Sequence, residues 1–217
     1  MNLRHSISLG LLGLSLTFSG SATAATPDDF IKTGQTGLTG LMKQPASPQR
    51  DVQVTATLDK LVDYAELARR CFRGDWAQLS EAQKTEVTEL LHKVVDRSYR
   101  RNLTRTLGYT VTYTGARAAA SDTLVRTEAK SSTNPRDPVV QIDYVVAGAA
   151  AGPFHIVDIV TAGSSLTNFY FTTFHPMLTA AGQGYPYIVA KLRTTLAGGA
   201  GATTATTASA TVSVKPD

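Results

Sequence analysis

Apolar and polar positions along this chain follow two different periods, which separate the predicted helices from the predicted strands. Between residues 57 and 72 apolar side chains recur every three or four positions, and this spacing predicts one amphipathic helix. A longer helix is predicted from Ser80 to about Leu107, because Ser80 and Gln83 fit a capping box and apolar residues then step by four along one face. A weaker helix is predicted from Pro27, since proline suits a first helical turn but several glycines follow it.

After Gly108 the period changes to two, which is typical of strands. Strands are predicted at residues 109–114, 123–130 and 139–147, and the nearly continuous apolar run at 154–160 predicts a fourth, more deeply buried strand. Short polar loops join these strands, so we expect an antiparallel meander with helices packed on one face. The predicted fold class is therefore α+β, with an antiparallel sheet of about four strands covered by helices.

A helix with large apolar side chains is predicted after the fourth strand. Gly163 ends the strand, and Ser164 or Ser165 can cap the next helix by accepting a hydrogen bond from a free backbone N–H. Large apolar side chains then recur at helical spacing at Leu166, Phe169, Tyr170, Phe174, Met177 and Leu178. These side chains are enough to line either a packed core or an apolar cavity. A second short amphipathic helix follows.

Two groups of short motifs stand in order between about residues 51 and 196. The first group contains Y-A-E-L-A-R-R at 64–70 and the segment 76–83, which begins with Trp and ends with Gln. The second group contains V-D-I-V at 157–160, G-S-S-L at 163–166, N-F-Y at 168–170, Phe174, Gly184 and the closing segment 188–193. In its order and spacing this set resembles the MlaC, or toluene-tolerance, family of soluble periplasmic phospholipid-binding components of lipid-transport systems.

The resemblance implies a curved sheet with an apolar cavity between sheet and helices, which holds phospholipid acyl chains. It also implies a carrier that shuttles lipid between the outer and inner membranes, in support of outer-membrane lipid asymmetry. Its expected partners are an inner-membrane ABC transporter complex and an outer-membrane lipoprotein complex. No cofactor is expected, and the protein is expected to be a monomer. The residues expected to line the cavity, each with an ordinary place in the core as its alternative, are Tyr99, Leu103, Val111, Tyr113, Val125, Ile142, Tyr144, Val146, Ile156, Phe169, Phe174, Met177 and Ile188.

Two places depart from the family pattern. Phe154 stands where a tryptophan is expected, and His155 replaces the basic residue that follows it. This change keeps a large apolar group. Phe171 stands where the family commonly has an arginine. This second change removes a charge near the expected mouth of the cavity, which leaves open a less polar ligand such as a hopanoid-type lipid.

The first residues of the chain predict export. Arg4 supplies a positive start, residues 7–18 form an apolar run, and the A-T-A sequence at 22–24 fits a cleavage site. Residues 1–24 are therefore interpreted as a cleaved secretory signal peptide. The expected location is the periplasm.

The rest of the chain is expected to form one lipid-binding domain at residues 25–196, followed by a tail. With 217 residues and 42% hydrophobic residues, the chain can build one sizeable core. Residues 197–217 are rich in alanine, glycine and threonine. Such a segment buries too little apolar surface to offset its ordering, so it is predicted to be disordered.

Charge and cysteine content narrow the function further. The formal net charge of +4 is compatible with anionic lipid headgroups, but it is too small and too dispersed for nucleic-acid binding. Along the predicted long helix, arginines recur every four residues at Arg97, Arg101 and Arg105. This stripe is either a solvated helix face or a docking surface. Cys71 is the only cysteine, which excludes an intramolecular disulfide, and its helical spacing from Leu67 predicts a small buried residue.

Catalytic and metal-binding chemistry finds little support in the sequence. His92, His155 and His175 lack the spacing of metal-binding motifs, so no metal site and no catalytic residue is assigned. The alternative class is an enzyme with a cone-shaped α+β fold that acts on a small apolar substrate. In that case Asp143, Asp158 or His155 would act inside the same cavity. A third interpretation is an adaptor protein whose apolar residues form only a core.

Overall fold

The computed structural model describes residues 26–148 and 153–198. The predicted signal peptide lies outside these residues, as does the predicted tail from residue 199 onward. The helices are α1 (Pro27–Met42), α2 (Pro48–Leu61), α3 (Tyr64–Phe72), the short 3₁₀ helix η1 (Arg73–Gln78), α4 (Glu81–Thr106), α5 (Leu166–Thr179) and α6 (Tyr185–Gly198). The strands are β1 (Tyr109–Ala119), β2 (Asp122–Ser131), β3 (Val140–Ala147), β4 (His155–Thr161) and β5 (Ser164–Ser165).

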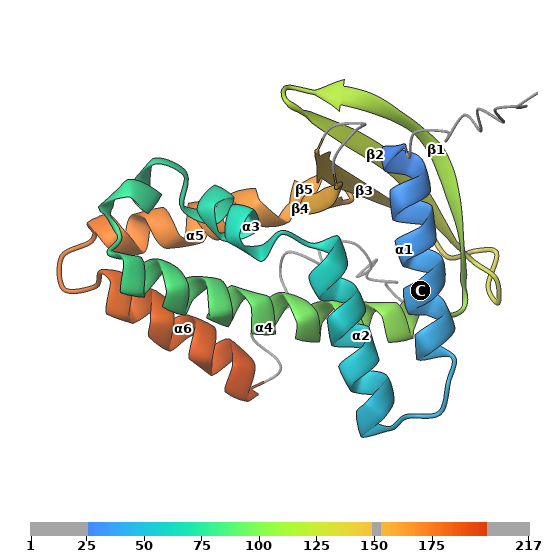
Figure 1. The fold of residues 1–217 in the computed structure, drawn as a ribbon, viewed down its shortest axis with the longest axis horizontal. Coiled ribbons are helices and arrows are strands. Elements are labelled where there is room, and N and C mark those ends of the chain that lie inside the picture. The colour runs from blue at the N-terminus through green and yellow to red at the C-terminus, as the bar shows by residue number, and fades with distance from the viewer. Residues whose placement is uncertain (1–25, 149–152, 199–217) are drawn as a thin grey trace, which may run out of the picture.

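The sheet is an antiparallel meander in which the spatial order β1-β2-β3-β4-β5 is also the chain order. This confirms the predicted α+β class and strand arrangement, with one additional strand. The two-residue strand β5 pairs with the end of β4, and it is too short to carry a period-two pattern. Figure 1 shows the curved sheet beside α1 and one end of α4, while α3, α5 and α6 gather around the other end of α4.

The single helix predicted over residues 57–72 is wrong, because the structure has two helices here, α2 and α3. Val62 leaves the helical conformation, with φ −109° and ψ 127°, and forms an isolated parallel bridge with Ile156. The Asp63 backbone N–H donates to the Ile156 carbonyl at 3.1 Å. The Asp63 side chain then caps α3 by accepting from the Glu66 N–H at 2.9 Å. This break ties the helices to β4, a tertiary contact that helical periodicity does not indicate.

The glycine-rich helix α1 packs closely against α2. A Cβ atom at Gly34 would lie 2.6 Å from the Leu61 Cδ2 atom, so the missing side chain permits the close approach of the two helices. The helix α2 begins at Pro48, where the Ser47 side chain caps it. Its first residues lie inside the stretch 43–50, which the two prolines of that stretch predict to be a loop, and the loop is therefore shorter than predicted.

The long helix and the four predicted strands begin within one residue of their predicted starts. The Ser80 side chain accepts from the Gln83 N–H at 3.3 Å, and the Gln83 Oε1 atom accepts from the Ser80 N–H at 2.9 Å, which confirms the capping box. Strand β1 continues past its predicted end to Ala119. A β-bulge after Tyr113 lets Gly115 adopt a φ of 128° while pairing with β2 continues beyond it.

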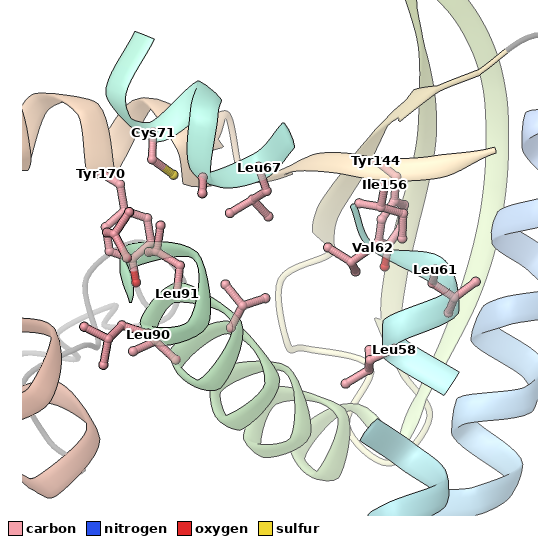
Figure 2. Packing of buried hydrophobic residues seen from close by; sticks show 14 of the residues in the cluster. Leu58, Leu61, Val62, Leu67, Cys71, Leu90, Leu91, Tyr144, Ile156 and Tyr170 are labelled. Carbon is pink, nitrogen blue, oxygen red and sulfur yellow. The ribbon is translucent and has the colours of Figure 1, made fainter. Parts of the chain in front are cut away.

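One hydrophobic core connects all the main helices to the sheet. Its fully buried side chains include Ile31 of α1, Val87 of α4 and Phe174 of α5. Cys71 is buried in this core, as predicted, and burial raises the pKa of its thiol. Figure 2 shows Cys71 on α3, on the same side of the view as Tyr170 and well apart from the part of the core that Tyr144 enters from the sheet.

Candidate functional site

The helix-facing surface of the sheet carries apolar and aromatic side chains. Cross-strand pairing places Tyr113 opposite Thr127 and Thr127 opposite Ile142. Directly paired residues share a face of the sheet, and so do residues two positions apart along a strand, which adds Tyr144 to this face. The Gln35 side chain of α1 donates a hydrogen bond to the Tyr144 hydroxyl. This contact identifies the face as the one that the helices cover.

Most residues predicted to line a cavity lie in the hydrophobic core or pack against it. The buried ones are Leu103, Val125, Tyr144, Val146, Ile156, Phe174 and Ile188. The partly buried ones that pack against the core are Tyr99, Tyr113, Ile142, Phe169 and Met177. Val111 is partly buried on β1 and does not belong to the core cluster. The partly buried residues retain surface that an apolar ligand would cover, so they are the stronger candidates for ligand contact.

The predicted lining residues fall into two regions of the core. Tyr144 and Ile156 point from the sheet towards α2, as Figure 2 shows. The residues of α5 lie in the second region, where the Phe174 ring packs with centroids 5.2 Å from Phe72 and 5.2 Å from Tyr170. Sequence spacing indicates that both sets face inward. It does not indicate that they face different parts of the core.

Polar groups also enter the helix-facing side of the sheet. Burial raises the pKa of Tyr99, Tyr113 and Tyr144, so these phenols are protonated at neutral pH. Gln35, the hydrogen-bond partner of Tyr144, was not predicted from the sequence. It lies in a glycine-rich helix without a polar motif, and no local signal marks it as an inward-facing residue.

Asp143 and Asp158 lie on the side of the sheet opposite to Tyr144. Asp143 precedes Tyr144 in β3, so its side chain points to the other face. Asp158 pairs with Val145, which shares the face of Asp143. The Asp143 Oδ2 atom lies 4.0 Å from the Arg126 Nε atom. The enzyme alternative needs these carboxylates inside the cavity, and their position gives it no support.

Asp158 uses its carboxylate to hold the start of α5. Its Oδ1 atom accepts hydrogen bonds from the Ile159 N–H at 2.8 Å and the Thr167 N–H at 3.0 Å. Its Oδ2 atom accepts from the Ser165 hydroxyl at 2.6 Å. The Ser165 side chain in turn caps α5 by accepting from the Asn168 N–H at 3.0 Å, which confirms one of the two predicted caps. The carboxylate therefore joins β4 to α5.

Replacing Asp158 with asparagine is expected to lower the free energy of unfolding by about 1–3 kcal/mol, because one of these buried donors loses its acceptor. Urea unfolding of the purified variant measures the change. Glu89→Gln alters an exposed acid on α4 and serves as the control, with an expected change below about 0.5 kcal/mol. An Asp158→Asn protein as stable as the wild type would contradict the structural role of this carboxylate.

A cation lies over the position where the family pattern has an arginine. The Arg73 guanidinium is 4.1 Å from the Phe171 ring centroid and donates to the Asn168 Oδ1 atom at 2.6 Å. His175 stacks on the same ring with centroids 5.3 Å apart, and its Nδ1 atom lies 2.7 Å from the Asp75 Oδ2 atom. Arg73 therefore supplies a positive charge beside Phe171 from a distant part of the sequence, which a motif comparison at position 171 does not reveal.

The arginine stripe of α4 includes a structural contact. Arg97 donates a hydrogen bond to the Leu196 carbonyl of α6, so it holds the two helices together. The side chain of Arg105 lies outside the described part of the chain. Arg97 stays exposed while it makes this contact, so a solvated face and a contact with α6 coexist at this residue.

Within residues 26–148 and 153–198, no group of three or more His, Cys, Asp or Glu side chains is placed to hold a metal ion. None of the helices in the same ranges combines the length and the apolar character that a membrane span requires.

Comparisons with known proteins agree with this fold. The family model described as MlaC protein matches residues 36–194, which run from α1 into α6. A solved structure of the phospholipid-binding protein from Ralstonia solanacearum, in complex with a phospholipid, has a TM-score of 0.66 to this chain at 22% sequence identity. The match covers 78% of this chain and 96% of that chain, and at this identity it shows the fold alone. No curated protein matches the chain.

Proposed function

The chain belongs to the MlaC family, and from this premise we propose that it is a periplasmic lipid carrier. It binds phospholipid acyl chains in an apolar space between the sheet and the helices. It then moves the lipid between the outer and inner membranes without any covalent chemistry.

The family match carries this proposal, because it extends over nearly the whole described fold, from α1 into α6. The similarity to the fold of a phospholipid-binding protein supports it. The side chains of this chain that suit acyl contact are the partly buried ones on the sheet and the covering helices, namely Tyr99, Tyr113, Ile142, Phe169 and Met177.

Burial of the acyl chains supplies the affinity. Each CH₂ group removed from water contributes about 0.8 kcal/mol, so two acyl chains together outweigh any single polar contact to a headgroup. The carrier therefore selects lipids by their apolar part and discriminates only weakly between headgroups.

The proposed location and docking partners of the protein follow from its family. The predicted signal peptide at residues 1–24 delivers the protein to the periplasm. There it acts as a monomer and docks in turn to an outer-membrane lipoprotein complex and an inner-membrane ABC transporter complex. The arginine stripe predicted along α4 is a candidate for the docking surface.

Lipid uptake from vesicles tests the proposal. We expect the mature protein to take up phosphatidylethanolamine and phosphatidylglycerol with identical acyl chains, with apparent affinities within about tenfold of each other, which corresponds to 1.4 kcal/mol. The bound lipid is quantified by mass spectrometry after the protein is separated from the vesicles. A much larger preference for one headgroup would contradict capture driven by acyl chains, and uptake of neither lipid would contradict the carrier function itself.

A further inference from the structure

Four polar side chains from four different elements come together in the otherwise apolar interior. Tyr99 belongs to α4, Tyr113 to β1, Tyr144 to β3 and Gln35 to α1. The Tyr144 hydroxyl accepts a hydrogen bond from the Gln35 Nε2 atom, and Tyr113 lies on the same helix-facing side of the sheet as Tyr144. The neighbouring phenol of Tyr113 adds to burial in raising the pKa of Tyr99, and the phenols of Tyr99 and Tyr113 both add to burial in raising the pKa of Tyr144. We call these four side chains the tyrosine cluster.

Apolar side chains surround the tyrosine cluster. Tyr144 is itself part of the hydrophobic core, and Tyr99 and Tyr113 pack against that core. Figure 2 shows Tyr144 next to Ile156 and close to Val62. The cluster therefore places polar atoms beside the surface that the proposed function assigns to acyl chains.

The cluster offers hydrogen-bond donors without matching acceptors. Because the Tyr144 hydroxyl accepts from Gln35, its own proton is available to a further acceptor. Within the described residues, the hydroxyls of Tyr99 and Tyr113 form no hydrogen bond. Burial raises the pKa of all three phenols, so at neutral pH they act as donors. Neither the Tyr99 nor the Tyr113 hydroxyl is among the fully buried side-chain atoms that lack a partner, so both keep surface at which a bound molecule can supply an acceptor.

The acceptor that suits the cluster is uncharged. The labelled side chains beside Tyr144 in the core, Ile156 and Val62, are apolar and carry no charge. A phosphate group at this place would lose its hydration without gaining a counter-charge. A carbonyl oxygen is neutral and accepts up to two hydrogen bonds. The carboxylic esters that join acyl chains to glycerol carry such oxygens directly at the start of each chain.

We propose that the tyrosine cluster is an ester-anchoring site, in which the phenols of Tyr99, Tyr113 and Tyr144 donate hydrogen bonds to the ester carbonyl oxygens of a bound diacyl lipid. Gln35 orients the Tyr144 hydroxyl for this task. The site fixes where the acyl chains begin, and the chains then extend along apolar side chains of the sheet and helices. This inference rests on the proposed lipid-binding function and adds the part of the lipid that the protein recognises.

A competition between ester-linked and ether-linked lipids tests the anchor. The mature protein is incubated with vesicles that contain equal amounts of diacyl and dialkyl phosphatidylglycerol of the same chain length, and native mass spectrometry measures the ratio of the two bound lipids. The dialkyl lipid lacks both carbonyls but keeps the headgroup and the apolar chains. We expect the wild type to favour the diacyl lipid by about threefold to tenfold, the range that one neutral hydrogen bond supports.

Tyrosine-to-phenylalanine variants test whether the tyrosine cluster causes the preference for the ester-linked lipid. Tyr144→Phe and Tyr99→Phe are expected to lower the ester preference to less than about twofold, because each removes a donor and keeps the ring. Tyr170→Phe is the matched control, since Tyr170 is also a buried tyrosine but lies on α5 outside the cluster. It should retain the wild-type ratio. Tyr113→Phe serves as a third variant if the Tyr144 or the Tyr99 substitution prevents folding.

The outcomes separate this inference from the proposed function. Equal binding of both lipids by the wild type would overturn the ester anchor while leaving lipid binding in place. An ester preference that survives in all three cluster variants would also overturn it. Binding of neither lipid would overturn the proposed function and the anchor together.

Discussion

Replacing Ile142 with aspartate is expected to reduce lipid uptake by roughly 100-fold or more, because a carboxylate beside an acyl chain loses hydration at a cost of about 3 kcal/mol or more. Ile142 lies on the helix-facing side of β3, in the same cross-strand row as Tyr113 and Thr127. Its side chain is only partly buried, so the ligand rather than the protein would cover the remaining surface. Vesicle uptake followed by mass spectrometry measures the effect.

The control for Ile142 uses the same kind of change on a neighbouring residue. Val139 directly precedes β3 and is 48% exposed, so Val139→Asp places the same charge in water. This variant should take up lipid like the wild type. Circular dichroism and thermal unfolding establish that both variants are folded, and Ile142→Asn replaces the aspartate variant if the charge prevents folding. Undiminished uptake by a folded Ile142 variant would show that this face does not contact lipid.

Replacing Phe174 with alanine is expected to lower the free energy of unfolding by about 3–5 kcal/mol, the range for truncating a buried phenylalanine. Phe174 is 1% exposed, and its ring packs between those of Phe72 and Tyr170. A loss of this size is a large part of the stability of an ordinary domain. Urea unfolding measures it directly.

A surface substitution on the neighbouring helix serves as the control for the stability loss expected of Phe174→Ala. Tyr187 of α6 is 49% exposed, so Tyr187→Ala should change the free energy of unfolding by less than about 1 kcal/mol. A similarly small loss for Phe174→Ala would contradict its place in the aromatic core. Because Phe174 is covered by protein, we expect Phe174→Leu to keep lipid uptake while lowering stability, in contrast to the Ile142 variants.

Local patterns predicted the elements whose periodicity is undisturbed. The capping box of Ser80 and Gln83 marks the start of α4, and the change to period two after Gly108 marks the start of the sheet. These signals depend only on neighbouring residues, so they can be read from the sequence. The antiparallel order follows because short loops leave consecutive strands no other partner.

The features that the sequence did not predict depend on contacts between distant residues. Val62 has helical neighbours on both sides, yet its bridge to Ile156 divides the predicted helix into α2 and α3. Gln35 meets Tyr144 only because α1 lies over the sheet. Arg73 reaches Phe171 because η1 lies beside α5. Each of these contacts becomes visible only when the chain is folded.

Sequence spacing also does not show which of the proposed lining residues contact a ligand. Their spacing predicts that Ile142 and Phe174 both face inward, and both do. Whether an inward side chain touches protein or ligand depends on how closely the opposite layer packs against it. Phe174 is covered by aromatic rings, whereas Ile142 keeps exposed surface, and periodicity alone does not separate these two cases.

Native mass spectrometry of the mature protein purified from a bacterial periplasm, with organic extraction of any bound molecule, tests the central claim most directly. We expect co-purifying phospholipid at about one equivalent, with its acyl chains held by the surface that includes Ile142. A mass without ligand, together with no lipid gained on incubation with vesicles, would contradict the carrier function and leave the apolar residues as an ordinary core.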